Sequence, residues 1–423
     1  MASHETGQSK MPRDSLNGVR VIDFSHVLAG PVCSMTLADL GAHVVKIEPP
    51  DGEIGRRIGP PWISGESPAF ISVNRNKYSV AIDLKTDAGR EAVRRMLLEA
   101  DVLVENFRPG VMASMGLDFD ALRQLNPRLV YCSISAFGQT GANRKRPGVD
   151  GVIQAVSGLM STLGTTSAEP LKVPIPVADM MGGYLASIAI LGTLHQVRTG
   201  GGGQHLDVSL YNATLMLQQI GFAAFFASGS EPEKTGSAAP YACPNEAFRT
   251  QDGWMMVVAY HPERWRALCE VLSSPSLEAD PRFATNDDRV RHRATLHHIL
   301  AARFVERTTA DWMERLAARD ILCAPVATYG DVIETAEYAE CGLEQTIDHP
   351  VAGTMRTLGF ALGPSDRPSA PDLPAPLTGQ HTLQMLERYG FAESEIAGLL
   401  NAGVIRVGRA SCETCDEDRK VSA

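Results

Sequence analysis

The residue best placed to do chemistry is Asp179, in the segment Pro174–Gly183 (PIPVADMMGG). It stands where a proline-rich extended segment meets a long apolar helix. In one interpretation, the Asp179 side chain caps that helix by accepting hydrogen bonds from its first backbone N–H groups. In the other, bare backbone at Gly182 and Gly183 lets a ligand approach, and the carboxylate beside the helix start attacks an activated acyl group. A carboxylate with the ordinary pKa of about 3.9 is ionised at pH 7 and needs no general base.

Basic residues that could hold an anionic ligand fall in three loops, at Arg75 and Lys77, at Arg108 and at 144–146 (RKR). Taken singly, each group is typical of a solvated loop. The chain has 423 residues and a formal net charge of −10. Three basic groups in one region of so acidic a chain predict a local site for a phosphate-rich small molecule. The overall acidity argues against general nucleic-acid binding, which needs a basic face.

The turn after the first predicted strand, Ser25–Pro31 (SHVLAGP), is where a doubly wound sheet would bind a nucleotide. It lacks the G-x-G-x-x-G pattern, although Glu48 ends the second strand where a ribose-binding acid would stand. A tight strand-to-helix turn explains its glycine and proline equally well, so dinucleotide binding is disfavoured. The sequence also lacks a serine-hydrolase elbow, a phosphate loop and metal-binding histidine spacings. We therefore expect no metal and no tightly bound cofactor.

The eight cysteines are scattered along the chain, and we interpret them as free thiols of a cytoplasmic protein. Half a zinc site or a redox pair stays open as an alternative for Cys412 and Cys415. The N-terminal residues have no apolar core of the kind that a secretory signal needs. The apolar stretch Leu185–Leu194 is half the length of a membrane span of about 20 residues, which favours a buried helix.

The elements that must position these residues alternate between strand and helix over the first half of the chain. Short β-branched segments at 19–24, 44–47, 79–82, 102–104, 129–133 and 205–209 alternate with helical patterns at 29–41, 87–100, 119–125, 149–159 and 180–197. This alternation predicts a Rossmann-like parallel sheet. A small polar segment at 228–240 then reads as a linker. Beyond it we predict a hairpin around Asp252 and Gly253 and three helices, at 262–272, 291–307 and 310–319.

Together the motifs resemble the class III CoA-transferases, the formyl-CoA transferase-like family. The matching segments are Val19–Pro31, Leu37–Glu48, Asn74–Leu84, Asp101–Gly110, Asn126–Thr140, Val177–Gly183, Gly203–Ser209, Asp252–Trp254 and Ile321–Val326. The resemblance implies a large α/β domain formed by both chain ends and a smaller α+β domain between them. It also implies an interlocked dimer of ring-like chains. We accordingly assign 15–227 and 329–408 to the large domain, 228–240 to the linker, 241–328 to the small domain and 409–423 to a charged tail.

The resemblance further implies that Asp179 is the nucleophile of a CoA transfer through an aspartyl-CoA thioester. Asp150 matches an acidic position near it, and Gly182 and Gly183 belong to the same neighbourhood. Positions that match CoA contacts of the family are Val27, Ala29, Val73, Arg75, Lys77, Asn106, Phe107, Arg108, Met115 and Arg146. The substrates implied are an acyl-CoA thioester and a small carboxylic or dicarboxylic acid. We favour succinyl-CoA as donor, because segment 236–244 lacks the glycine-rich loop of the formyl-CoA enzymes. No nucleic-acid or membrane partner is expected.

Two other functions stay open. A racemase of the same fold family, resembling α-methylacyl-CoA racemase, would move a proton α to the thioester with a base on each face. It typically carries a histidine where this chain has Val149, between Gly148 and Asp150. A CoA-binding protein without catalytic activity is the other alternative.

Overall fold

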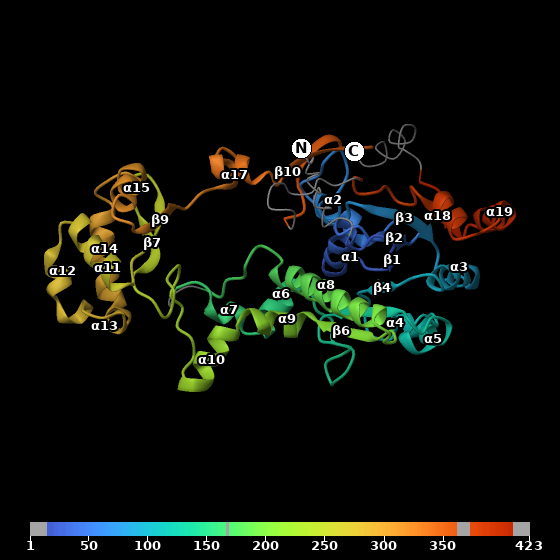
Figure 1. Ribbon diagram of the computed structural model, residues 1–423, viewed down its shortest axis with the longest axis horizontal. Coiled ribbons are helices and arrows are strands. Elements are labelled where there is room, and N and C mark those ends of the chain that lie inside the picture. The colour runs from blue at the N-terminus through green and yellow to red at the C-terminus, as the bar shows by residue number, and fades with distance from the viewer. Residues whose placement is uncertain (1–14, 166–168, 362–372, 409–423) are drawn as a thin grey trace, which may run out of the picture. The chain divides into compact units, whose positions relative to one another are not determined.

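The computed structural model describes residues 15–165, 169–361 and 373–408, and these residues divide into two compact units (Figure 1). Unit 1 takes its residues from 15–157, 173–217 and 337–408, and unit 2 takes them from 158–172 and 218–336. This division differs from our predicted domain boundaries, since 158–172, 218–227 and 329–336 belong to unit 2. The predicted charged tail at 409–423, with Cys412 and Cys415, lies outside the described residues.

Unit 1 is built on a seven-stranded sheet with the order β12-β3-β2-β1-β4-β5-β6. Its strands are β1 (Arg20–Asp23), β2 (His43–Glu48), β3 (Lys77–Ile82), β4 (Val102–Glu105), β5 (Val130–Ser135), β6 (His205–Ser209) and β12 (Ile405–Arg406). The first six pair in parallel, and β12 adds antiparallel to β3. The predicted parallel sheet is thus confirmed. Its order reverses between β1 and β4, which is where doubly wound sheets bind their ligands.

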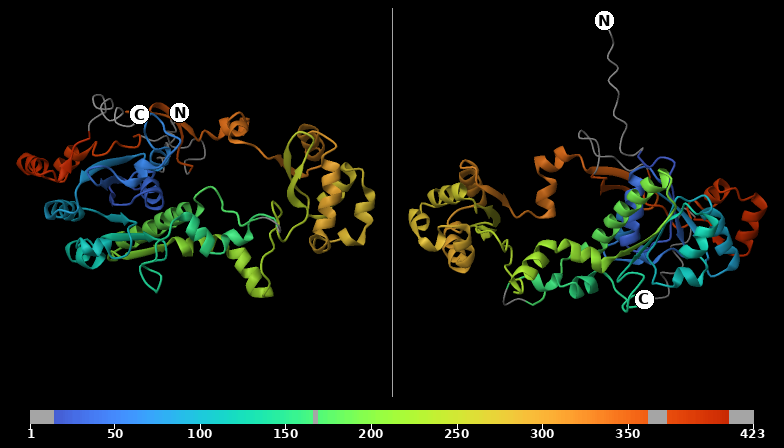
Figure 2. Two further views of the ribbon diagram at one scale, coloured as in Figure 1. Left: turned by 180° about the vertical axis from the view of Figure 1, so that it is seen from behind. Right: turned by 60° about the horizontal axis from the view of Figure 1, so that its bottom comes forward.

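Helices cover both faces of this sheet (Figure 2). One face carries α1 (Ala29–Asp39), α6 (Asp150–Val156), α8 (Val177–Arg198) and α9 (Leu210–Leu217). The other carries α3 (Asp87–Leu97), α4 (Val111–Ser114), α5 (Phe119–Leu125), α18 (Thr382–Arg388) and α19 (Glu393–Asn401). Successive strand residues point to opposite faces, so Val21 packs in one core and Ile22 in the other. Covering both faces explains why the strands read as continuous apolar runs.

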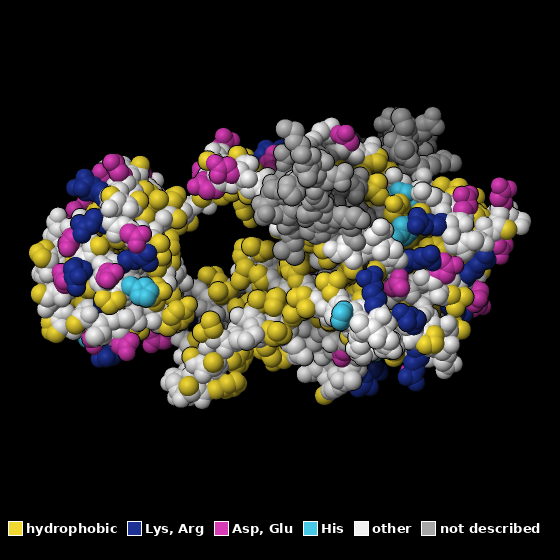
Figure 3. Space-filling view, viewed as in Figure 1, with side chains coloured by type: hydrophobic (Ala, Val, Ile, Leu, Met, Phe, Trp, Pro, Cys, Tyr) yellow, Lys and Arg dark blue, Asp and Glu magenta, His cyan; other side chains and the backbone are white. Residues whose placement is uncertain are grey.

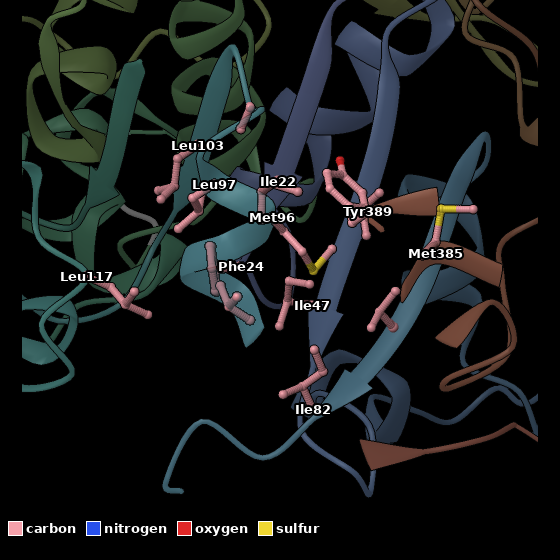
Figure 4. Packing of buried hydrophobic residues seen from close by; sticks show 14 of the residues in the cluster. Ile22, Phe24, Ile47, Ile82, Met96, Leu97, Leu103, Leu117, Met385 and Tyr389 are labelled. Carbon is pink, nitrogen blue, oxygen red and sulfur yellow. The ribbon is translucent and has the colours of Figure 1, made fainter. Parts of the chain in front are cut away.

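The second of these cores joins segments that are far apart in the sequence. Met96 of α3 and Met385 of α18 pack in one cluster with Ile22, Ile82 and Tyr389 (Figure 4). The C-terminal helices therefore complete the same hydrophobic core as the first strands. Unit 1 also contains η2 (Ile54–Arg57), α2 (Pro68–Val73), the antiparallel pair β10 (Glu344–His349) and β11 (Gly353–Leu358), and all of α17 (Ala336–Cys341) except its first residue.

Helix α8 is longer than the apolar stretch from which we predicted it. Among the residues that the structure describes, it is the one helix long and apolar enough to cross a membrane. Its buried residues include Ala178, Ala186, Ile190 and Leu194, which recur every four residues or at multiples of four and belong to the core beneath the sheet. A core helix can have the same composition as a membrane span, and these residues pack one side of α8 against the sheet.

Unit 2 holds a three-stranded antiparallel sheet with a helical layer. The strands are β7 (Asn245–Arg249), β8 (Trp254–Val258) and β9 (Leu322–Pro325). The helices are α7 (Leu159–Thr162), α10 (Gln219–Ser228), α11 (Pro262–Val271), α12 (Pro275–Ala279), η3 (Pro281–Phe283), α13 (Asn286–Arg291), α14 (Arg293–Phe304), α15 (Thr309–Ala317) and α16 (Tyr329–Ile333). The hairpin around Asp252 and Gly253 has the predicted form. The single helix predicted at 291–307 is instead interrupted at His292, where α13 ends and α14 begins.

Candidate active site

The turn between β1 and α1 lies at the reversal point of the sheet and is fixed by the segment after β4. Asn106 Nδ2 donates to the carbonyl of His26, and Asn106 Oδ1 accepts from the amide of His26, both at 2.8 Å. The ring of Phe107 meets the ring of His26 edge-on, with centroids 5.1 Å apart. Two predicted CoA-contacting segments, at Val27–Ala29 and at 106–108, are therefore neighbours in the structure.

Helix α8 brings Asp179 close to this turn because two glycines let the helix approach its neighbours. A Cβ on Gly183 would lie 2.6 Å from the carbonyl oxygen of Ala29 in α1, and a Cβ on Gly182 would lie 2.4 Å from Leu210 Cδ2 in α9. We predicted that these glycines admit a ligand, but the close approach that they permit is between helices. Residues four apart share a helix face, so Asp179 lies on the face that Gly183 turns toward α1.

Asp179 is the third residue of α8 and does not cap it, so the capping interpretation is wrong. The N-terminal flanking residue is Pro176, and the capping acceptor comes from another helix. Oδ2 of the buried Asp150 accepts from the amide of Ala178 at 2.8 Å and from that of Asp179 at 3.4 Å. Oδ1 of Asp150 accepts from Gln154 Nε2 at 2.6 Å. Among the described residues, none donates a hydrogen bond to the Asp179 carboxylate, which leaves that group open for chemistry.

Burial raises the pKa of Asp179 to about 7, and the nearby Asp150 carboxylate adds to the effect. The ordinary pKa that we expected is therefore wrong for this site, and Asp179 is only partly ionised at pH 7. A helix start can stabilise an oxyanion through free backbone amides, but the first three amides of α8 are not free. The first amides of α8 are committed, that of Val177 to the carbonyl of Ile175 and the next two to Asp150.

Two of the predicted phosphate-binding residues are buried and paired with acids. Arg75 makes a two-point ion pair with Asp39, at 3.1 and 2.6 Å, and donates to the carbonyl of Leu358 at 3.0 Å. Lys77 Nζ is fully buried and lies 3.2 Å from Asp23 Oδ2, with further bonds to Asn74 Oδ1 and the carbonyl of Pro31. These contacts hold the loop and the strand ends in place. That the two side chains also touch CoA stays a prediction.

The other two basic side chains are exposed. The Arg108 side chain has no hydrogen bond or ion pair to any residue that the structure describes, and the Arg146 guanidinium lies 5.2 Å from the Phe137 ring centroid. Val73, at the end of α2, packs in a small apolar cluster with Met180, the residue after Asp179. Met115 packs against the core on the opposite face of the sheet. The structure thus brings Val73 to the neighbourhood of Asp179 and leaves Arg108 and Arg146 free to meet an anion.

Sequence reasoning missed a buried charge network beside the carboxyl ends of β1 and β2. Glu48 accepts two bonds from Arg56, both 2.7 Å, and one from Ser79 Oγ at 2.6 Å, so it is not the ribose-binding acid considered above. Lys46 Nζ lies 3.6 Å from Glu53 Oε1, and both side chains are fully buried. The signal was present in the strand sequence HVVKIE, because a charge inside a doubly covered strand must be paired.

Comparisons with known proteins agree with this fold. A succinyl-CoA:glutarate CoA-transferase of Mus musculus is 36% identical over 95% of this chain and 93% of its own length. An acetyl-CoA:oxalate CoA-transferase of Acetobacter aceti is 34% identical, over 87% of this chain and 95% of its own. The crystal structure of a CAIB/BAIF family protein from Brucella suis superposes with a TM-score of 0.79 at 33% identity, covering 88% of this chain and 99% of that one.

Fold, site and relatives together define an enzyme that transfers CoA. The chain belongs to CoA-transferase family III, whose family description matches residues 16–382. The racemase and the non-catalytic CoA-binding protein considered above are correspondingly disfavoured.

Proposed function

We propose that the chain moves CoA from succinyl-CoA to a small dicarboxylic acid, with Asp179 as the covalent nucleophile. The observation that carries the proposal is the half-buried Asp179 carboxylate, which accepts no hydrogen bond from the residues that the structure describes. It stands beside the turn at which a doubly wound sheet binds its ligand. Asp150 accepts hydrogen bonds from the backbone amides of Ala178 and Asp179 and leaves the Asp179 carboxylate free.

The proposed reaction exchanges acyl and thiolate groups through Asp179. Its carboxylate attacks the donor thioester, which gives an acyl-aspartyl anhydride and releases CoA thiolate. The thiolate attacks the aspartyl carbonyl of the anhydride, freeing the donor acid and forming an aspartyl-CoA thioester. The acceptor carboxylate attacks this thioester, which forms a second anhydride and releases CoA thiolate again. The thiolate then attacks the acceptor's carbonyl. The products are the new acyl-CoA and a regenerated Asp179 carboxylate. Water must be kept from both anhydrides, which hydrolyse readily.

The substrates are proposed from the relatives together with the sequence. The names of the two relatives above state succinyl-CoA with glutarate, and acetyl-CoA with oxalate. Both acceptors are dicarboxylates. Because segment 236–244 lacks the glycine-rich loop of the formyl-CoA enzymes, we place glutarate-sized acids ahead of oxalate.

A donor and acceptor panel tests this proposal. We expect succinyl-CoA and glutarate to give succinate and glutaryl-CoA, with kcat/KM for oxalate at least about tenfold lower, a difference of 1.4 kcal/mol. Mass spectrometry of the acyl-CoA products is the measurement. A run in deuterated water is the control, because a racemase would place deuterium at the α-carbon of the thioester. Deuterium uptake without new acyl-CoA would contradict transfer.

The raised pKa of Asp179 predicts an acidic limb in the pH profile. The ionised carboxylate is the nucleophile, so kcat/KM for the donor should fall as the pH drops below about 7 and level off above it. Asp150→Asn removes one cause of the raised pKa and keeps an oxygen that can accept from Ala178. The limb should therefore move to lower pH, although burial keeps it above the ordinary value. An unmoved limb would assign it to another group, such as Glu105, whose pKa burial also raises to about 7.

We also propose a homodimer, interlocked as the family resemblance implies. Large apolar side chains are exposed on the face formed by α6, α8 and α9 (Figure 3). They include Tyr184 and Ile188, which are 44% and 63% exposed, as well as Val152, Met216 and Leu217. A contiguous apolar face of this kind calls for a covering partner, here a second copy of the chain. Sedimentation equilibrium should give twice the chain mass of 45.5 kDa.

A cytoplasmic location also stays a prediction, supported by the free thiols of the six described cysteines.

A further inference from the structure

The turn between β1 and α1 contains a residue in an unfavourable backbone conformation. Val27 has φ +66°, in the left-handed region, where a β-branched side chain crowds its own backbone. Such a conformation persists only where the surroundings enforce it, and it tends to occur at functional sites. We therefore expect specific contacts to hold Val27 in this conformation, and the conformation to serve the site.

The group that holds Val27 is the carboxylate of Glu53, which is 1% exposed. The amide of Val27 points at both of its oxygens, 3.2 Å from Oε2 and 3.4 Å from Oε1. The amide of Gly55 donates to Oε2 at 2.5 Å. On the other side, Lys46 Nζ lies 3.6 Å from Oε1 and keeps the buried carboxylate paired.

Each of three consecutive residues in the turn is thus held by a different partner. Lys46 Nζ donates to the carbonyl of Ser25 at 2.6 Å, Asn106 clamps both backbone groups of His26, and Glu53 accepts from Val27. Helix α1 begins two residues later at Ala29, whose carbonyl lies against Gly183 of α8. The conformation of Val27 therefore decides where the first turn of α1 lies relative to the helix that carries Asp179.

We propose that Glu53 is a positioning residue for the CoA ester. Its carboxylate holds Val27 in the left-handed conformation, and this fixes the turn and the start of α1 on which the CoA ester is to lie. The inference rests on the proposed function, in which Val27 and Ala29 contact CoA. Glu53 itself touches no substrate in this account, since it is buried beneath the turn.

The test is Glu53→Gln, with the KM for the acyl-CoA donor as the main measurement. The amide is neutral and its single oxygen is a weaker acceptor than the carboxylate, and it loses the second oxygen that Val27 also faces, so Val27 is held less firmly. We expect the KM to rise about tenfold while kcat changes less than about threefold, the signature of a loss in ester binding. An unchanged KM would overturn the proposal.

A second substitution separates positioning from general stability. Glycine adopts positive φ without strain, so a chain with Val27→Gly no longer needs Glu53 to enforce the turn. In that background, Glu53→Gln should raise the KM by less than about twofold, whatever Val27→Gly does by itself. An equal tenfold effect in both backgrounds would mean that Glu53 acts otherwise, and would overturn the proposal.

Two further variants complete the design. Glu246→Gln removes another buried acid, in unit 2 and paired with His297, and should lower stability without raising the KM. If Glu53→Gln fails to fold, Glu53→Asp keeps the charge facing Lys46 but withdraws the carboxylate from Val27. A wild-type KM in Glu53→Asp would then overturn the proposal. A wild-type chain that binds CoA but transfers nothing would contradict the proposed function and leave the role of Glu53 open to test. The Glu53 and Val27 variants would then be compared by their Kd for CoA in place of the KM.

Discussion

Replacing Asp179 by asparagine should abolish CoA transfer, lowering kcat by about four orders of magnitude or more. The amide has the shape of the carboxylate but cannot form the anhydride or the aspartyl-CoA thioester. Incubation with an acyl-CoA donor and hydroxylamine should leave a hydroxamate at Asp179 in the wild-type chain, detected by peptide mass spectrometry, and none in Asp179→Asn.

The stability of Asp179→Asn is the control, because it shows whether the inactive variant is still folded. The pKa of Asp179 lies above its unfolded value, so the folded state disfavours the ionised form, and this loss of stability develops as the pH rises from about 4 to about 7. A neutral asparagine avoids the loss, so urea unfolding at pH 8 should show a variant at least as stable as the wild-type chain. Substantial transfer by both Asp179→Asn and Asp179→Ala would place the nucleophile elsewhere.

Lys77→Met should destabilise the chain by about 3–5 kcal/mol, because it leaves the buried Asp23 without its main partner. Burial raises the pKa of Asp23, but Lys77 and Lys46, together with hydrogen bonds from the Ser25 and Ser34 hydroxyls, outweigh it and hold that pKa below its ordinary value. Burial likewise lowers the pKa of Lys77 to about 8, although Asp23 opposes the shift. Each member of the pair therefore depends on the other. Urea unfolding at pH 7 measures the free energy.

Arg108→Met is the matched comparison for Lys77→Met. The Arg108 side chain is exposed and makes no hydrogen bond or ion pair with the described residues, so its loss should leave the unfolding midpoint unchanged and raise the KM for the CoA ester. If Lys77→Met instead kept full stability and raised only the KM, Lys77 would be a ligand contact and its pairing with Asp23 of little weight.

The sheet could be predicted because the physics that forms it is local. Short β-branched runs such as Val102–Glu105 alternate with amphipathic helices such as α3, and this alternation leaves little choice but a parallel sheet. The two-residue β12 has no readable period, so its pairing with β3 could not be predicted.

The site was harder to predict, because its residues acquire their roles from distant partners. Asp179 was identified from its position, but its raised pKa depends on burial and on Asp150, which no local pattern reveals. The ion pairs of Arg75 with Asp39 and of Lys77 with Asp23 could not be predicted, because a sequence shows charges but not which acids lie opposite them. The role of Glu53 could not be predicted from the sequence, because it depends on the φ angle of Val27.

The packing of α18, α19 and β12 on the first strands has a consequence for synthesis on the ribosome. A nascent chain that ends at residue 361 already contains β1 to β6, but the edge of β3 is open and the cluster around Met96 lacks Met385 and Tyr389. Unit 2 is complete in that chain, since all its residues precede 337. Unit 2 can therefore fold first. The part of unit 1 that is synthesised before it still has an unpaired strand edge and exposed apolar surface at that stage. Translation of the last segment is the step that ends this exposure.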